Sequence, residues 1–101
     1  QWEPYSINDE AVPVIDAFKA LSAYVDKYSL QSITCRTGIL IAPPYKMKIA
    51  RGLITNFHQP RSTLLLLVSA FTGQAWEDIY RHALAGGYRF LSYGDSSILL
   101  V

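Results

Sequence analysis

The sequence predicts a mixed α/β fold, in which a mixed β-sheet of about five strands carries three helices packed on it. Three observations support this fold class. Two segments repeat their apolar residues every three or four positions, as amphipathic helices do. Several short segments rich in β-branched residues end at Pro or Gly, as strands do. Half of the 101 residues are apolar and only 17% are charged, which indicates a globular chain.

The first predicted helix covers residues 9–29. Its apolar residues fall at steps of four and three, which places them on one face. Pro13 suits the first turn, where a missing N–H costs little. These apolar residues are Val14, Phe18, Leu21, Val25 and Tyr28. The pattern favours a packing helix.

Three strands are expected next, over residues 33–42, 45–49 and 53–57. The first is rich in β-branched residues and stops at Pro43 and Pro44, which cannot continue a central strand. The second alternates apolar residues with lysine, as in a half-exposed strand. The third is mostly apolar, as in a strand that is covered on both faces.

The segment from Thr63 to Thr72 is apolar nearly all round and predicts a buried helix that ends at Gly73. A second helix is expected from Trp76 to Leu84, because its apolar residues recur at helical spacing. Residues 88–93 and 97–101 are predicted strands. The stretch between Phe57 and Tyr88 is long enough for a parallel crossover, so we expect strands 53–57 and 88–93 to be parallel neighbours.

Composition narrows the classes of function only slightly. The net charge is +1, but residues 36–101 hold seven of the nine basic residues and three of the eight acidic ones, so this part can face phosphates. The single cysteine, Cys35, allows no disulfide within the chain and fits a reducing cytoplasm. The longest apolar run is too short to span a membrane. Two histidines and one cysteine make no zinc site, and we expect no bound metal.

The first group of candidate site residues lies where strand 53–57 meets the buried helix. The free N–H groups of a helix start attract anions, and an arginine fork suits a carboxylate or a phosphate. A histidine that titrates near neutrality can act as a general acid or base. Four of the residues also have a structural alternative: Ser62 and Thr63 as helix caps, Asn56 as a partner of turn backbone, and His58 as a hydrogen-bonded histidine. The group consists of Asn56, His58, Arg61, Ser62 and Thr63.

A second group follows strand 88–93. Asp95 comes after Gly94 in a predicted turn and either carries charge for a ligand or only shapes the turn. Tyr93 either stacks on a base or packs. We expect Asp95 and His58 to open onto one cleft.

Two long motifs hold these residues: GLITNFHQPRSTLLLLVSAFTG, from Gly52, and YRFLSYGDSSILL, from Tyr88. Together they resemble the C-terminal part of the S-adenosylmethionine:tRNA ribosyltransferase-isomerase family of the queuosine pathway. Gln59 and Arg61 stand where that family usually has Leu and Lys. Residues 33–101 are interpreted as the C-terminal α/β part of the catalytic domain of a longer, multi-domain enzyme. Residues 1–32 are interpreted as a lineage-specific lead-in and amphipathic helix.

The resemblance implies a reaction and its partners. The ribosyl part of S-adenosylmethionine moves to the aminomethyl group of a 7-deazaguanine in the tRNA anticodon loop and is isomerised to give epoxyqueuosine, while adenine and methionine leave. By physical fit, His58 and Asp95 are the expected catalytic residues. Substrate is expected to contact Asn56, Arg61, Ser62, Thr63, Tyr93 and Gly94. A monomeric cytoplasmic enzyme is expected, with the remainder of its own chain as a further partner. The alternative is a non-catalytic packing or RNA-contact subdomain.

Overall fold

The computed structural model describes Tyr5 and residues 12–101, and it confirms the mixed α/β class. The chain divides into two units, Gln1–Ile39 and Leu40–Val101. Its elements in chain order are α2 (Val14–Lys27), β1 (Gly52–Asn56), α3 (Thr63–Thr72), α4 (Ala75–Ala85) and β2 (Ser96–Leu100). Over the described residues, none of the helices combines the length and the hydropathy needed to cross a bilayer.

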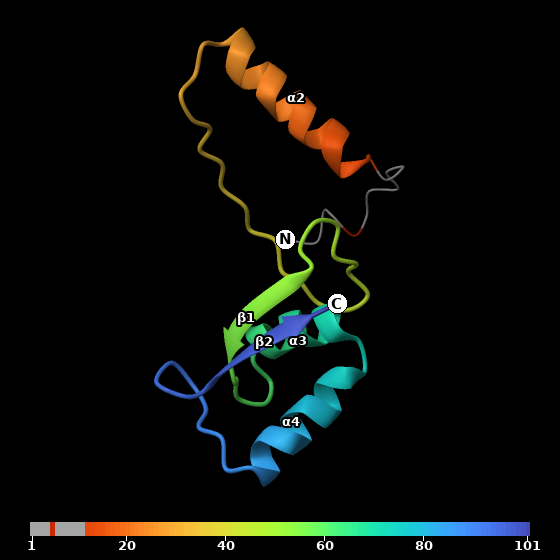
Figure 1. Ribbon diagram of the computed structural model, residues 1–101, viewed down its shortest axis with the longest axis vertical. Coiled ribbons are helices and arrows are strands. Elements are labelled where there is room, and N and C mark those ends of the chain that lie inside the picture. Colours follow the sequence, from red (N-terminus) through yellow and green to blue (C-terminus); the bar gives the residue numbers. More distant parts are fainter. Residues whose placement is uncertain (1–4, 6–11) are drawn as a thin grey trace. The chain divides into compact units, whose positions relative to one another are not determined.

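The prediction of about five strands is wrong, because the described residues form one sheet of two strands. β1 and β2 are antiparallel and lie side by side in Figure 1. Leu53 pairs with Leu99, and Ile54 pairs with Ile98. Since directly opposed residues point to the same side, the first pair faces the helices and the second faces away from them.

The core of the second unit lies between the inner face of this sheet and helices α3 and α4. The ring of Phe57 is at its centre, with centroids 5.5 Å from Tyr80, 5.6 Å from Tyr88 and 5.5 Å from Phe90. Such offset and edge-to-face contacts add to the free energy gained by burial. The buried members of this cluster are Phe57, Val68, Phe71, Tyr80, Ala83 and Leu99.

Helix α3 has the predicted bounds. Ser62 caps its first turn, with the Leu65 N–H donating to Ser62 Oγ at 3.2 Å. Gly73 ends it with a positive φ of 63°. The expectation that the helix is buried all round is wrong, because only Val68 and Phe71 are buried. The helix turns one side to the core and leaves other leucines in contact with solvent.

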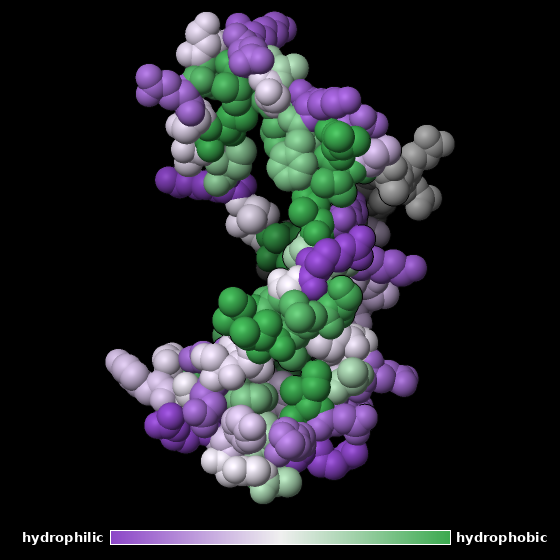
Figure 2. Space-filling view, viewed as in Figure 1, coloured by the Kyte–Doolittle hydropathy of each residue, from purple (hydrophilic) through white to green (hydrophobic). Residues whose placement is uncertain are grey.

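The outer face of the sheet is also apolar and exposed. Figure 2 shows a hydrophobic patch over the two strands. Its residues Ile54, Ile98 and Leu100 are all mostly exposed. A two-stranded sheet with a bare apolar face is marginal by itself.

The predicted strands 33–42 and 45–49 do not form. Neither segment is a strand of the one sheet that the described residues form. Pro43 and Pro44 are joined by a cis peptide bond. A β-branched composition is only a preference for extended backbone, and the tertiary context decides whether a strand forms.

The predicted strand 88–93 is a loop instead. Leu91 has a φ of 73°, which is incompatible with extended backbone. The Tyr88 N–H donates to the Ala83 carbonyl, and the Leu91 N–H donates to the Phe57 carbonyl. These bonds hold the segment as a connection from α4 to β2.

Helix α2 confirms the predicted amphipathic helix over Val14–Lys27, with Pro13 just before its first residue. Residues 9–11 of the predicted range lie outside the described residues. None of the 14 residues of α2, all of which the structure describes, is buried. Within the first unit its C-terminal end is tied by a Tyr24–Tyr28 ring contact, with centroids 4.7 Å apart, and by Lys27 Nζ, 5.3 Å from the Tyr28 ring.

Val68 is predicted to matter more to stability than Leu66. Val68 is 1% exposed and Leu66 is 40% exposed. Val68→Ala removes buried methyl groups and should lower the free energy of unfolding by roughly 2 kcal/mol. Leu66→Ala removes more atoms but should cost less than about 1 kcal/mol. Urea denaturation of both variants measures the difference. Equal losses would show that α3 is packed on both sides.

Candidate functional site

The two segments that hold the predicted site residues are hydrogen-bonded to each other through Asn56 and Phe57. The end of β1 and the start of β2 lie next to each other because the strands are antiparallel, and not because parallel strands converge as expected. The Leu91 N–H donates to the Phe57 carbonyl at 2.8 Å, and the Phe57 N–H donates to the Asp95 carbonyl at 3.3 Å. The segments 56–63 and 89–96 therefore form one end of the sheet.

Asn56 is the central connector at this end. Its Nδ2 donates to the Leu91 and Ser92 carbonyls at 3.0 and 3.1 Å, and its Oδ1 accepts from Ser96 Oγ at 2.6 Å. One side-chain amide thus uses both of its N–H groups and its oxygen within the site. The structural alternative considered for Asn56, satisfaction of turn backbone, describes what these bonds do.

His58 is held in a defined position. Its Nε2 lies 2.6 Å from Thr55 Oγ1, and its backbone N–H donates to the Tyr80 hydroxyl at 3.0 Å. Partial burial lowers the pKa of the His58 imidazole below its usual value, because it penalises the charged form. The ring is therefore neutral at pH 7 and available as a base.

Asp95 is paired with Arg89. Its Oδ2 accepts the Arg89 backbone N–H at 2.7 Å, and its Oδ1 accepts from the Arg89 guanidinium at 3.1 Å. The side-chain hydrogen bond from Arg89 is the main cause that lowers the pKa of Asp95, and the backbone bond acts in the same direction. The carboxylate is ionised at neutral pH and closes the 89–95 loop.

Three other predicted residues, Arg61, Ser62 and Thr63, lie together at the start of α3. They line a cavity of about 220 Å³ together with residues of α3 and with Trp76. Arg61 has a positive φ of 64°, and Ser62 uses its hydroxyl to cap the helix. The capping alternative is therefore observed for Ser62, and its hydroxyl also lines the cavity.

Tyr93 and Gly94 form the tip of the 89–95 loop. The Gly94 N–H donates to the Leu91 carbonyl at 2.9 Å. A Cβ on Gly94 would lie 2.5 Å from the Arg89 carbonyl oxygen, so this tight turn requires glycine. Tyr93 is 97% exposed and does not pack against the core.

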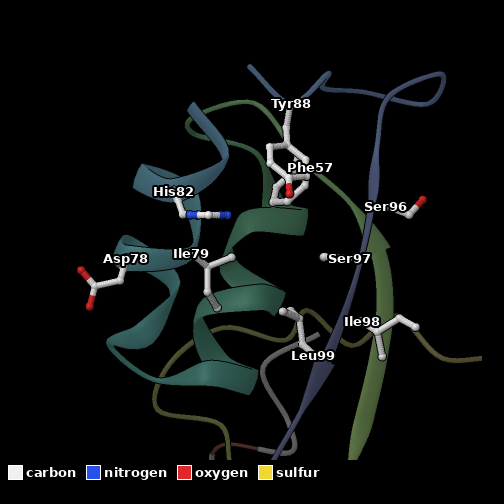
Figure 3. Close-up of a pocket in the computed structure, with 9 residues that line it drawn as sticks. All are labelled: Phe57, Asp78, Ile79, His82, Tyr88, Ser96, Ser97, Ile98 and Leu99. Atoms are coloured by element: carbon white, nitrogen blue, oxygen red, sulfur yellow. The ribbon is translucent and has the colours of Figure 1, made fainter. Parts of the chain in front are cut away.

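A second cavity, of about 520 Å³, lies between α4 and β2 (Figure 3). Phe57, Ile79 and Leu99 supply its apolar wall, and the imidazole of His82 points from α4 toward that wall. Asp78 points away from it, and its carboxylate pairs with Arg81 at 2.8 Å. Neither His58 nor Asp95 lines this cavity or the one at the start of α3.

Sequence reasoning missed the residues that orient the predicted ones. Thr55 holds the imidazole of His58, Tyr80 holds the His58 backbone, and Arg89 holds the Asp95 carboxylate. The spacing of Thr55 and His58, three residues apart around the end of a strand, was the only local signal available. The Tyr80 contact spans 22 residues and leaves no trace in local sequence.

Comparison with known proteins bears on the origin of this arrangement. The profile of a family described as "Queuosine biosynthesis protein" matches residues 11–99. The chain belongs to this family. The match includes both segments that hold the predicted site residues, 56–63 and 89–96. It confirms the family resemblance of the two sequence motifs.

Relatives of the chain carry a more specific name. The chain is 51% identical over 79 residues to the S-adenosylmethionine:tRNA ribosyltransferase-isomerase of Sinorhizobium medicae, covering 77% of this chain and 22% of that protein. The Agrobacterium fabrum protein of the same name is 58% identical over 64 residues, covering 62% of this chain and 18% of that protein. The chain therefore spans about a fifth of the length of these relatives.

A solved structure also resembles the chain. The crystal structure of the S-adenosylmethionine tRNA ribosyltransferase from Thermotoga maritima matches with a TM-score of 0.61 and 47% identity. The match covers 64% of this chain and 24% of that one. The likeness supports the fold of the matched part.

His58 is predicted to titrate below pH 6.5, and its protonation should weaken the fold. The folded-state pKa is lowered, so the unfolded state binds the proton more tightly. The contribution of neutral His58 to the free energy of unfolding is present above pH 6.5. This contribution is lost as the pH falls through the pKa that His58 has in the folded state. NMR titration of the imidazole and urea denaturation between about pH 5 and 8 measure both effects. His58→Gln should flatten the pH dependence, and an unchanged slope would contradict the assignment.

Proposed function

We propose that this chain is part of an S-adenosylmethionine:tRNA ribosyltransferase-isomerase. The enzyme transfers and isomerises the ribosyl part of S-adenosylmethionine onto 7-aminomethyl-7-deazaguanine in the tRNA anticodon, giving epoxyqueuosine. The observation that carries the proposal is the family match over residues 11–99, with relatives of that name more than 50% identical. S-adenosylmethionine is the ribosyl donor, and no metal is part of the proposal.

His58 is proposed as the base or proton shuttle. The sulfonium of S-adenosylmethionine acidifies the adjacent C5′ protons, and a neutral imidazole accepts one of them. The Thr55 hydroxyl lies 3.3 Å from the Asn56 carbonyl, to which it donates. In the proposed tautomer, Thr55 Oγ1 accepts from His58 Nε2–H at 2.6 Å, which leaves Nδ1 with the lone pair for the substrate proton. Thr55 is a positioning residue in this arrangement.

The start of α3 is proposed to hold an anionic group of a substrate. Arg61 provides a planar fork, and the first turn of the helix provides backbone N–H groups near Thr63. The methionine carboxylate and a tRNA phosphate share this chemistry. The cavity of about 220 Å³ beside these residues accommodates a small group and not a whole nucleoside.

Asp95 is proposed to serve the cationic or hydroxylated part of the donor. Arg89 occupies one lone-pair direction on each carboxylate oxygen, and a carboxylate has about four such directions. The remaining ones accept from ribose hydroxyls or face the sulfonium. Asn56 and Gly94 set the backbone around it, and Tyr93 projects from the same loop.

The proposed partners are tRNA, S-adenosylmethionine and the remainder of a longer chain of the same enzyme. The apolar outer face of the sheet and the exposed side of α3 suit cover by that remainder. The enzyme is proposed to act as a monomer in the cytoplasm, where its tRNA substrate is found. Residues 33–101 are proposed as part of the catalytic domain, and residues 1–32 as a lead-in and helix, of which residues 11–32 fall within the family match.

A second candidate is a packing or RNA-contact subdomain with no activity of its own. The observation that favours it is the openness of the site. His58 and Asp95 lie next to residues at one end of the two-stranded sheet, and neither of them lines the cavity at the start of α3. A dry pocket for this chemistry needs further walls.

The chain by itself is predicted to release no adenine from S-adenosylmethionine. The groups described form one wall of a site that must enclose both a nucleoside and an anticodon base. Incubation with S-adenosylmethionine and tRNA that carries the aminomethyl-deazaguanine, followed by chromatography for adenine, tests this. A full-length relative serves as the positive control. Multiple turnovers by the chain would show that the wall is already a complete site.

In a full-length enzyme containing this segment, His58→Ala and Asp95→Ala should each lower turnover by about 10²-fold or more. Gln59→Ala, an exposed neighbour in the same turn, is the matched control and should change turnover little. Adenine release and thermal melting of each variant separate the causes. Near-normal turnover would make the residue a turn former, and a collapsed melting temperature would make its role structural.

A further inference from the structure

Tyr93 stands out among the aromatic residues of the second unit. It is 97% exposed, whereas Tyr80, Phe57 and Phe90 pack into the core. A large ring left in water forgoes the free energy of burial. Such a side chain in a rigid loop is a candidate contact surface.

The loop on either side of Tyr93 is tightly held. The carbonyls of Leu91 and Ser92 accept both N–H groups of Asn56 Nδ2, at 3.0 and 3.1 Å. On the other side, the Asp95 N–H donates to the Arg89 carbonyl at 2.9 Å, and the Asp95 carboxylate accepts from Arg89 twice. Tyr93 therefore projects from a fixed frame, and its backbone loses little further freedom when it binds a partner.

The frame also contains unfavourable backbone geometry. Leu91 adopts a φ of 73°, which a side chain with Cβ rarely does. Gly94 fits only because it has no Cβ, since that atom would lie 2.5 Å from the Arg89 carbonyl oxygen. Strained positions of this kind persist when surrounding bonds enforce them, and they concentrate at ligand-binding loops.

We infer that Tyr93 is a stacking platform for an unpaired base of an RNA partner. The inference rests on the proposed function and identifies the contact that the 89–95 loop makes. Its immediate neighbours Ser92 and Gly94 are polar or small, and the exposed Arg89 guanidinium lies in the same loop. An aromatic face framed by polar groups and a cation suits a nucleobase, which has π faces, polar edges and a nearby phosphate.

The location fits this role. The loop shares one end of the sheet with His58, because Asn56 joins both segments. A base stacked on Tyr93 would neighbour the base that reacts, in an anticodon loop whose bases are unpaired. The same ring face serves any base, so Tyr93 supplies affinity and position and not sequence specificity.

The test uses an anticodon stem–loop RNA with the fluorescent base 2-aminopurine beside the position to be modified. Titration with the 101-residue chain should quench the fluorescence, because stacking on an aromatic ring does so. Tyr93→Ala should abolish the quenching and raise the Kd about tenfold, the loss expected for one stacked base. Tyr93→Phe keeps the aromatic ring and should retain both the fluorescence quenching and the affinity for the RNA. Tyr28→Ala, which removes an exposed tyrosine of the first unit, is the matched control and should behave as the unmodified chain.

Three results would overturn the inference: no RNA binding by the chain, unchanged quenching in Tyr93→Ala, or equal losses in Tyr93→Ala and Tyr93→Phe. A lowered melting temperature in Tyr93→Ala would also overturn it, because the ring would then be packed. Failure here is distinguishable from failure of the proposed function. Adenine release by a full-length enzyme tests the latter and does not depend on stacking by this fragment.

Discussion

The antiparallel pairing of β1 with β2 is the constraint on which the second unit depends. It brings two segments 40 residues apart in the chain to one end of a sheet, where Asn56 meets Ser96. The register also sets the faces, so that Leu53 and Leu99 turn to the helices while Ile54 and Ile98 turn away from them. A slip of one residue would exchange the two faces and remove Leu99 from the core.

The pairing of β1 with β2 positions both the core of the second unit and the candidate site. Phe57, the first residue after β1, is the aromatic centre of the core, and its neighbour His58 is the proposed base. The backbone that buries the Phe57 ring also places His58 directly after it, where the imidazole contacts Thr55 Oγ1 at 2.6 Å. The Tyr80 hydroxyl completes this coupling, because a residue buried in α4 holds the His58 N–H. The core residue Phe57 and the proposed base His58 are neighbours in one turn. A substitution in this turn can therefore change both stability and activity, and both must be measured.

The exposed apolar surfaces have a consistent physical meaning. The outer face of the sheet and one side of α3 are more apolar than a surface in water favours, and the chain spans about a fifth of its relatives' length. The sequence of α3 is typical of a helix buried on every side, yet within the second unit only Val68 and Phe71 of this helix are buried. The segments 33–42 and 45–49 show a similar mismatch, since they have strand-like composition and are not strands of the sheet that the described residues form. Their sequences fit a larger structure than these residues can build alone.

The sequence by itself determined the local features. It established the bounds of α3 with a cap at Ser62 or Thr63 and an end at Gly73, the amphipathic α2, the two polar segments that hold the candidate residues, and the family, through two motifs. Those features depend on spacing, caps and residue type within a few positions. Only the tertiary structure decided that β1 and β2 are antiparallel, that residues 88–93 form a loop, and that Asp95 pairs with Arg89 while His58 rests on Thr55 and Tyr80. Strand partners and most side-chain partners are distant along the chain, and the free energy that selects them comes from pairing and packing in three dimensions, which local spacing does not encode.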